Sequence, residues 1–397
     1  KGEYDSRYCG WHSVAYSPKD EVVVVSCVNR KPDGTRWTYL YRLDPATAAA
    51  KRKGVANSVV PRYHLNFDWR TRKLPAPDPE ALDKKYAALP ANEWVQMPGP
   101  HVSRKGWGSA CIDTDKGVIL YIGGGHSTYS GTDTAHYDIG AGRWSLSYPP
   151  EFPPFLYGTN RTVYGWSYNL HPWAEHTRRW YEYDPISKMM VYNRQGSMRP
   201  NRVYHSGIGK TGVVKTTGNS TWVYDPRLRK WYPPTTDRPF GTGDADHLVS
   251  TPKGIYAHTG KKGVWHCEVK KVEENGKIRY AAHWKQVIKK APSSGYDLKG
   301  TSVYDSKRHR LVVLKTPGYM DIIDLNAMKV GRIKPASGRV PYYREAVYIP
   351  DQDVIFSPNG YKKKGYSVYR CAENKWVRVD IASPVIRGTD HRGRKYA

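Results

Sequence analysis

Apolar runs alternate with short polar turns along most of the chain. One unit recurs: a strand that ends in an apolar or aromatic residue, a turn of Asp, Pro, Ser, Lys or Gly, and a β-branched strand. Each unit predicts a β-hairpin, and the uninterrupted apolar second strand is typical of a strand buried on both sides. The unit occurs seven times, the fourth copy being short, at 13–25, 109–121, 180–192, 206–214, 248–256, 301–314 and 345–356.

Several copies are followed by a second hairpin, in which a strand with Tyr, a polar turn and a closing Trp succeed one another. Examples are 135–144, 221–231 and 367–376. Two successive hairpins make the four-stranded blade of a β-propeller. The copies anchored at Tyr304 and Tyr348 are 44 residues apart, a normal blade length. We therefore predict an all-β fold: a single seven-bladed β-propeller domain over residues 1–397.

The uneven spacing of the copies predicts two long loop insertions, at 45–106 and 146–175. We expect both on the surface, where they would cap a face or hold a partner. The first contains a short helix over Glu80–Leu89, and the chain ends in a basic tail at 387–397. The closing Trp of the second hairpins and the run Gly123-Gly-Gly125 resemble the kelch type of propeller over most of the chain.

The balance of charge points to an anionic neighbour. The chain has 63 Lys and Arg against 36 Asp and Glu, a formal net charge of +27. An acidic protein surface or an acidic glycan would suit this charge, and a general bias toward solubility is the alternative. The basic runs are scattered outside any recognisable nucleic-acid module, so we expect no specific nucleic acid. No apolar run approaches the roughly 18 residues of a membrane helix, so we expect no membrane span.

The cysteines and histidines show no standard metal site. None of the five cysteines forms a C-x-x-C pair, and their disulfide pairing is left open. His171 and His176 are five residues apart, which fits no common ligand spacing. The sequence therefore leaves the metal content unknown and predicts no cofactor of the chain's own.

Four basic residues stand at or just before the first strands of their units: His12, His205, His247 and Arg344. Equivalent positions in different blades surround the central axis of a propeller. These side chains are therefore candidates for an anion-binding ring at one mouth of the central channel. The alternative is structural, with the same side chains capping strands and hydrogen-bonding between blades.

The most unusual local string is Gly123-Gly-Gly-His-Ser-Thr-Tyr-Ser-Gly-Thr-Asp133, in which small residues leave His126 and Tyr129 projecting from a tight turn. It resembles propeller polysaccharide lyases of the ulvan and rhamnogalacturonate type. The resemblance implies a secreted enzyme that cleaves uronate-containing polysaccharide by β-elimination, with a His or Tyr base and a cation neutralising the carboxylate. The implied catalytic candidates are His126, Tyr129, His176, Arg202 and Tyr204. A structural role for the string is the alternative.

At the level of the whole chain, the size, the single propeller and the same Gly-rich blade style resemble the β (propeller) subunits of hydrazine synthase from anammox bacteria. This resemblance implies a non-catalytic scaffold subunit of a multi-subunit haem enzyme. It also implies haem c on α and γ partner subunits, which make hydrazine from nitric oxide and ammonium. The implied location is extracytoplasmic, the anammoxosome lumen or a periplasm-like space. An adhesion or sensor propeller that binds an anionic ligand without chemistry is a third alternative.

Overall fold

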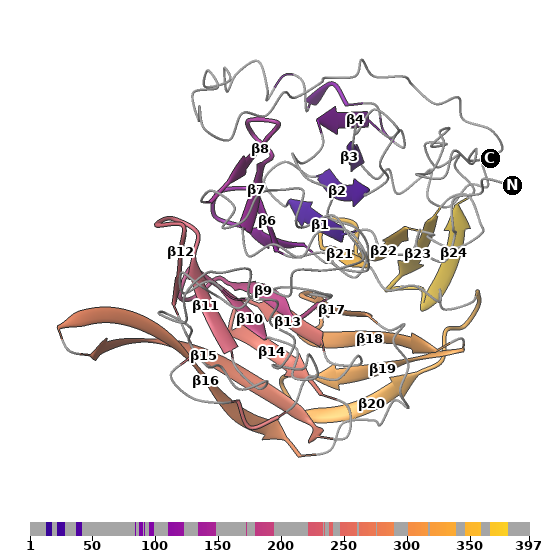
Figure 1. Cartoon of the computed structure of the whole chain (residues 1–397). Coiled ribbons are helices and arrows are strands. Elements are labelled where there is room, and N and C mark those ends of the chain that lie inside the picture. Colours follow the sequence, from indigo (N-terminus) through magenta and orange to yellow (C-terminus); the bar gives the residue numbers. More distant parts are fainter. Residues whose placement is uncertain are drawn as a thin grey trace, which may run out of the picture.

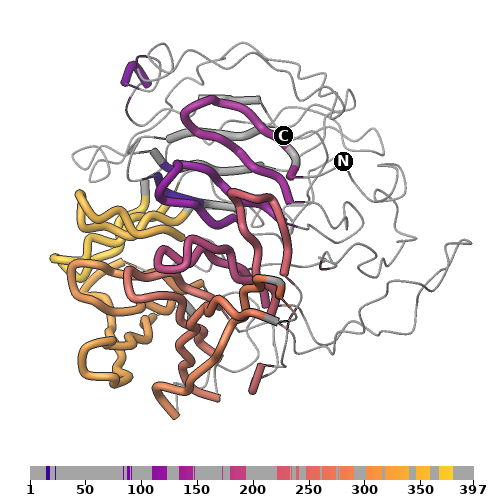
Figure 2. The backbone as a smooth tube through the Cα atoms, turned by 90° about the vertical axis from the view of Figure 1, so that its left-hand side faces the viewer, coloured from indigo at the N-terminus to yellow at the C-terminus, as the bar shows by residue number. Residues whose placement is uncertain are grey.

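The computed structural model is an all-β propeller with blades arranged around a ring (Figures 1 and 2). Its described strands form six four-stranded sheets. The described residues are 13–17, 22–27, 37–41, 84, 87–89, 91, 95–98, 110–122, 134–147, 172, 179–193, 221–232, 234, 238–240, 247–259, 262–274, 276–289, 301–316, 318–338, 346–358 and 366–379.

Each blade is an antiparallel meander of four consecutive strands. Blade 1 contains β1 (Ser13–Ser17), β2 (Val22–Cys27), β3 (Trp37–Tyr41) and β4 (Val95–Pro98). Blade 2 contains β5 (Cys111–Asp113), β6 (Val118–Ile122), β7 (Thr134–Asp138) and β8 (Arg143–Leu146). Blade 3 contains β9 (Tyr181–Asp184), β10 (Met189–Asn193), β11 (Thr221–Asp225) and β12 (Lys230–Tyr232).

The other three blades have the same order. Blade 4 contains β13 (His247–Thr251), β14 (Gly254–His258), β15 (Val264–Glu274) and β16 (Lys277–Ile288). Blade 5 contains β17 (Thr301–Asp305), β18 (Arg310–Thr316), β19 (Tyr319–Asp324) and β20 (Lys329–Ile333). Blade 6 contains β21 (Val347–Ile349), β22 (Val354–Pro358), β23 (Tyr366–Arg370) and β24 (Lys375–Val379).

The inner strands close a ring. β1, β5, β9, β13, β17 and β21 contact one another in this order, and β21 also contacts β1. The junction of the last blade with the first contains a hydrogen bond from the Tyr16 hydroxyl to Asp351 Oδ2, at 3.3 Å. Because the described blades already close on themselves, the predicted count of seven blades is wrong, and the described residues make six.

The strand pairing shows where the count failed. Six of the seven predicted hairpins form the first two strands of the six blades. The short copy at 206–214 lies outside the described residues, and the strands on either side of it, β10 and β11, pair directly with each other. The copy therefore stands between the second and third strands of blade 3. The kelch-type assignment stays a prediction, because residues 123–125 also lie outside the described part.

The predicted second hairpins are confirmed as the outer two strands of blades 2, 3 and 6. In each of them a Tyr pairs across the strands with the closing Trp, and the ring centroids lie 5.1, 4.9 and 5.2 Å apart. Such aromatic pairs stabilise a sheet beyond the burial of their area. The recurrent Tyr and Trp of the sequence are thus cross-strand neighbours: Tyr137 and Trp144, Tyr224 and Trp231, Tyr369 and Trp376.

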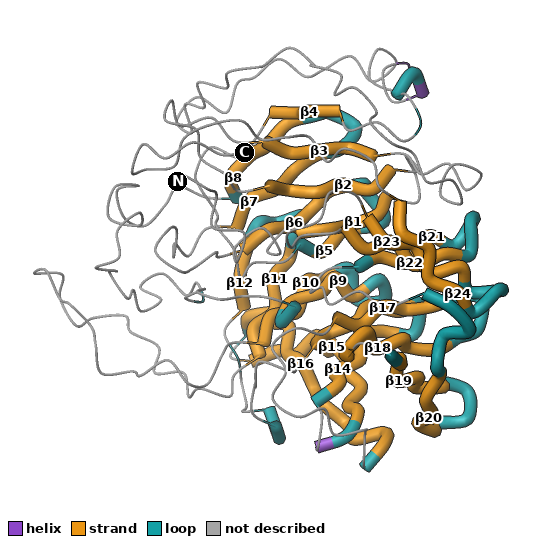
Figure 3. The backbone as a smooth tube through the Cα atoms, turned by 90° about the vertical axis from the view of Figure 1, so that its right-hand side faces the viewer, coloured by secondary structure: helices purple, strands orange, loops and turns teal. Residues whose placement is uncertain are grey.

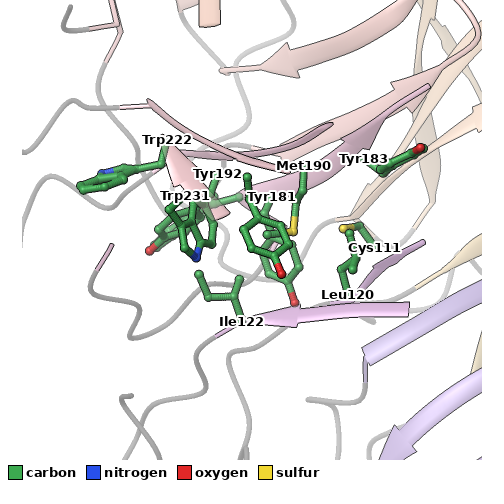
Figure 4. Packing of buried hydrophobic residues seen from close by; sticks show 11 residues of the cluster. Cys111, Leu120, Ile122, Tyr181, Tyr183, Met190, Tyr192, Trp222 and Trp231 are labelled. Atoms are coloured by element: carbon green, nitrogen blue, oxygen red, sulfur yellow. The ribbon is translucent and has the colours of Figure 1, made fainter. Parts of the chain in front are cut away.

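The core fills the spaces between blades. Figure 4 shows Leu120 and Ile122 of β6 close to aromatic side chains of blade 3, including Tyr181 and Trp231. Cys111 of blade 2 belongs to the same buried cluster. Large aromatic side chains bury much apolar area each, which explains how a chain with few Phe builds its core.

Six of the described turns, three between first and second strands and three between third and fourth strands, are short and follow one design, which begins with Asp113, Asp138, Asp184, Asp225, Asp305 or Asp324. Asp113 Oδ1, for example, accepts hydrogen bonds from the backbone N–H groups of Asp115 and Lys116, at 3.1 and 3.2 Å. The fourth residue after the Asp has a positive φ, 67° for Gly117 and 63° for Lys188. These reversals confirm the predicted turn residues and define the turn face of the propeller, shown by most of the teal segments on the right of Figure 3.

The opposite end, the loop face, receives the connections between blades and those between second and third strands, because antiparallel strands alternate in direction. The predicted insertion 146–175 lies between β8 and β9 and therefore joins strand ends at the loop face. The insertion 45–106 begins between β3 and β4, at the turn face, and includes β4 itself. Within it, Ala88 N–H donates to the Lys84 carbonyl at 3.0 Å, one turn of the expected helix.

Residues 387–397 lie outside the described part, so the basic tail stays a prediction. Among the residues that the structure does describe, no helix is long and apolar enough to cross a membrane.

Candidate functional site

The inner strands start at the loop face, close to the propeller axis. Three side chains from different blades gather there, and we call them the axis cluster: Arg179 before β9, His247 at the start of β13, and Ser302 near the start of β17. All three are buried. This is the place where the sequence predicted a ring of basic side chains.

Arg179 connects four blades. Its Nη2 donates to the carbonyl of Ala346 in blade 6 at 2.7 Å, and its Nη1 donates to the carbonyl of Ser302 in blade 5 at 3.4 Å. Its own carbonyl accepts a hydrogen bond from Leu248 N–H of blade 4 at 2.8 Å. The side chain therefore crosses from blade 3 to the far side of the ring, and its charge-assisted hydrogen bonds hold the inner strands together.

His247 is the predicted site residue that the structure describes. Its Nδ1 lies 3.3 Å from Ser302 Oγ, and it pairs across the first hairpin of blade 4 with His258. Its side chain is 7% exposed. The contact with blade 5 fits the structural alternative considered for these residues, in which they hydrogen-bond between blades. An anion-binding role for His247 stays a prediction.

The other predicted site residues lie outside the described part of the chain, so the structure neither brings them together nor separates them. Each falls before a first strand, after the last strand of a blade or between second and third strands, and the described strand ends next to these positions are at the loop face. Their roles stay predictions. They are His12, His205 and Arg344 of the anion-binding ring, and His126, Tyr129, His176, Arg202 and Tyr204 of the lyase hypothesis.

A second buried polar group joins blades 2 and 3. His136 Nε2 lies 2.8 Å from the Tyr224 hydroxyl and 2.9 Å from Ser147 Oγ, and the Ser147 and Tyr224 hydroxyls are also hydrogen-bonded to each other. Burial lowers the pKa of His136 to about 3, with further lowering from nearby Arg229. Burial raises the pKa of Tyr224. Both side chains are therefore neutral at pH 7, which suits a fixed contact between blades.

Three cysteines of the described strands and turns are poorly placed to act as nucleophiles. Cys111, Cys267 and Cys371 are buried free thiols, and burial raises the pKa of each. A thiol whose pKa is raised is protonated at pH 7 and reacts slowly. Within the described strands and turns, no group of three His, Cys, Asp or Glu side chains could hold a metal ion.

Sequence reasoning missed Arg179, Ser302 and the Ser147–Tyr224 contact. A signal for Arg179 was present, since it stands just before a first strand, as His12 and Arg344 do. The partners of Arg179 carried no such signal, because Ser302 and Ala346 are 123 and 167 residues away in the chain.

Comparisons with known proteins add little to this description. No protein-family model matches the chain, and neither does any curated protein. Two solved structures similar to it are an auxiliary nutrient binding protein from Bacteroides thetaiotaomicron and apo AztD from Citrobacter koseri. The first has a TM-score of 0.42 and 9% identity over 94% of this chain and 68% of its own. The second has a TM-score of 0.39 and 10% identity over 94% and 74%.

At these TM-scores and identities, neither structure supports an argument about this chain. The class of the protein therefore rests on its own strand pairing and ring closure, which define a β-propeller.

Proposed function

We propose that the chain is a non-catalytic β-propeller subunit that scaffolds a multi-subunit extracytoplasmic haem enzyme complex of the hydrazine synthase kind. The observation that carries the proposal is the set of hydrogen bonds that the Arg179 guanidinium makes to other blades. It donates to main-chain carbonyls of blades 5 and 6, so a cation at the axis serves to join blades. A propeller held together in this way offers its outer surfaces to partners.

Charge and resemblance extend this proposal to particular partners. The net charge of +27 favours acidic protein surfaces. The resemblance to hydrazine synthase β subunits, drawn from size, fold and blade style, supports haem c on α and γ partner subunits. On those subunits nitric oxide and ammonium would be converted to hydrazine, in the anammoxosome lumen or a periplasm-like space. The chain itself would carry no cofactor.

The test is native mass spectrometry, combined with an absorption spectrum, on the protein purified from its own source. The proposal expects stoichiometric partner chains and a haem Soret band in the same particle. A colourless particle that contains this chain alone would contradict it.

A secreted polysaccharide lyase is the second candidate, and one observation favours it. The segments that contain its five candidate residues are the β6–β7, β8–β9 and β10–β11 connections, whose flanking strands end at the loop face of two neighbouring blades. The test is incubation with uronate-containing polysaccharides such as ulvan. A lyase would produce unsaturated products that absorb in the ultraviolet, and His126→Ala would abolish them. No new absorbance with the wild-type protein would exclude this candidate for the polysaccharides tested.

A further inference from the structure

The third and fourth strands of blade 4 form the longest described hairpin. β15 has 11 residues and β16 has 12, whereas the next longest described strand has 7. β14 pairs with β15 only as far as Cys267, but β15 and β16 stay paired as far as Glu274 and Lys277. The outer part of this hairpin, residues 268–284, extends beyond its own blade as an arm, at the left of Figure 1.

One side of the arm packs onto blade 3. Because side chains two positions apart along a strand share a side, Trp284, Ala282, Tyr280 and Ile278 all lie on this side of β16. Trp284 Nε1 donates to Thr221 Oγ1 at 3.0 Å. Ala282 and Tyr280 pack against buried apolar residues of blade 3, and the ring of Tyr280 lies 5.2 Å from that of Tyr232.

The same side of β16 continues from Tyr280 toward the tip of the arm. Ile278, two positions beyond Tyr280, is 50% exposed. On blade 3, Leu228 in the β11–β12 turn is 67% exposed. Both residues flank the contact between the rings of Tyr232 and Tyr280: Leu228 stands in the turn that leads into β12, which contains Tyr232, and Ile278 stands two positions from Tyr280 on the same side of β16. Next to Leu228, Arg227 donates to Asp225. Ile278 and Leu228 are thus exposed apolar side chains on either side of one contact.

The exposed charged side chains around this contact include two cations, Arg227 and Lys271, and one carboxylate, Glu273. Lys271 pairs with Tyr280 on the same side of the arm and is exposed. The Arg227 side chain is 47% exposed, whereas its partner Asp225 is 1% exposed, so the cation of this pair is the part that meets solvent. Glu273, paired with Ile278, is the acidic side chain on this side of the arm. We call these residues the arm patch: Arg227, Leu228, Lys271, Glu273, Ile278 and Tyr280.

We propose that the arm patch is the surface on which an acidic partner subunit docks. This inference rests on the proposed function, since it assumes a complex. A protein interface usually has apolar side chains at its centre and a charged rim around them. A few of the central side chains supply most of the binding energy. The net charge of the chain, +27, together with the exposed Arg227 and Lys271 of the patch, favours a partner surface rich in Asp and Glu.

The test is zero-length cross-linking of the complex purified from its own source, with a carbodiimide that joins lysine amines to carboxylates. The proposal expects Lys271 to be linked to Asp or Glu of another kind of chain. Lys270 is the matched control, because it is the next residue and is also exposed but lies on the opposite side of the arm. Lys329 on blade 5 is a distant exposed control. Neither control should form this link.

A second measurement uses reconstitution of the complex from separated chains. Ile278→Asp places a carboxylate in the patch and should weaken binding of the chain to its partners by roughly tenfold or more. Met328→Asp introduces the same charge at another exposed apolar residue, in blade 5, and should leave binding unchanged. Unchanged secondary structure in circular dichroism would show that both variants fold.

The outcomes separate the two proposals. A chain that purifies without partners would contradict the proposed function. Partners that co-purify while Lys271 forms no link to them, and while Ile278→Asp binds as the wild type does, would overturn the arm patch alone. A link from Lys271 to a second copy of this chain would also overturn it.

Discussion

The junction between blades 5 and 6 allows a quantitative test of how the ring is held. Arg308, in the turn of blade 5, makes two hydrogen bonds of 2.7 Å to the two carboxylate oxygens of Asp353 in the turn of blade 6. Tyr348 donates to the same carboxylate at 2.8 Å. The side chains of Arg308 and Asp353 are 30% and 16% exposed. The pair is therefore bidentate, charge-assisted and partly shielded from water.

We predict a coupling energy of about 2 kcal/mol between Arg308 and Asp353, because hydrogen bonds to charged groups contribute roughly 1.5–3 kcal/mol and two that share one pair are not additive. The perturbations are Arg308→Met, which keeps the aliphatic stem, and Asp353→Asn, which tolerates the positive φ of 53°. Urea denaturation of the wild type, both single variants and the double variant gives the coupling energy from the free energies of unfolding.

The pH dependence supplies a further check. Arg308, and after it Tyr348, hold the pKa of Asp353 below its usual value. A carboxyl with a lowered folded pKa contributes stability above its unfolded pKa, near 3.9, and loses it as the pH falls through the folded pKa. The coupling should be complete at pH 7 and disappear in strong acid.

The control is the exposed pair Arg370 and Glu373, whose side chains are 38% and 42% exposed. Its coupling energy should stay below about 0.5 kcal/mol. The reasoning would be refuted if the Arg308–Asp353 pair gave no larger coupling than this exposed pair at pH 7.

Three further predictions concern single residues. Trp231→Ala should lower the free energy of unfolding by about 3–5 kcal/mol, because Trp231 is buried against Tyr224; a loss below about 1 kcal/mol in urea denaturation would contradict this. Wild-type stability should fall as the pH is lowered from 6.5 toward 3, because His136 takes up a proton only in the unfolded state. The curve for His136→Gln should be flatter, and parallel curves would contradict the assignment. Met328→Gly should raise stability by up to about 1 kcal/mol, since Met328 has a φ of 50° and is 39% exposed; a fall in thermal midpoint would contradict it.

The local part of the fold could be predicted from the sequence. Pairs such as Tyr224 and Trp231 lie a few residues apart around one turn, so their side chains meet whenever the hairpin forms. The same holds for the turn residue Asp113, whose hydrogen bonds reach only two and three residues along the chain. The residues that determine hairpins and turns of this kind lie within about a dozen positions of one another.

The count of blades and the axis cluster depend on contacts that no local pattern contains. Residues 206–214 have the composition of a hairpin, and only the pairing of β10 with β11 shows that they add no blade of their own to the described ring. The contact of Arg179 with Ala346 joins blades 3 and 6. The arm was missed for a related reason: Tyr280 packs on residues of another blade, and no pattern within the hairpin contains this contact.

The central claim is that Arg179 helps to close the ring and that the propeller is a subunit of a larger complex. The most direct test is a cryo-electron microscopy map of the particle purified from its own source. We predict six four-stranded blades, with the Arg179 guanidinium against the carbonyls of Ser302 and Ala346 and other chains bound to the propeller. A seventh blade in the ring, an Arg179 side chain turned away from these carbonyls, or a particle of this chain alone would contradict the account.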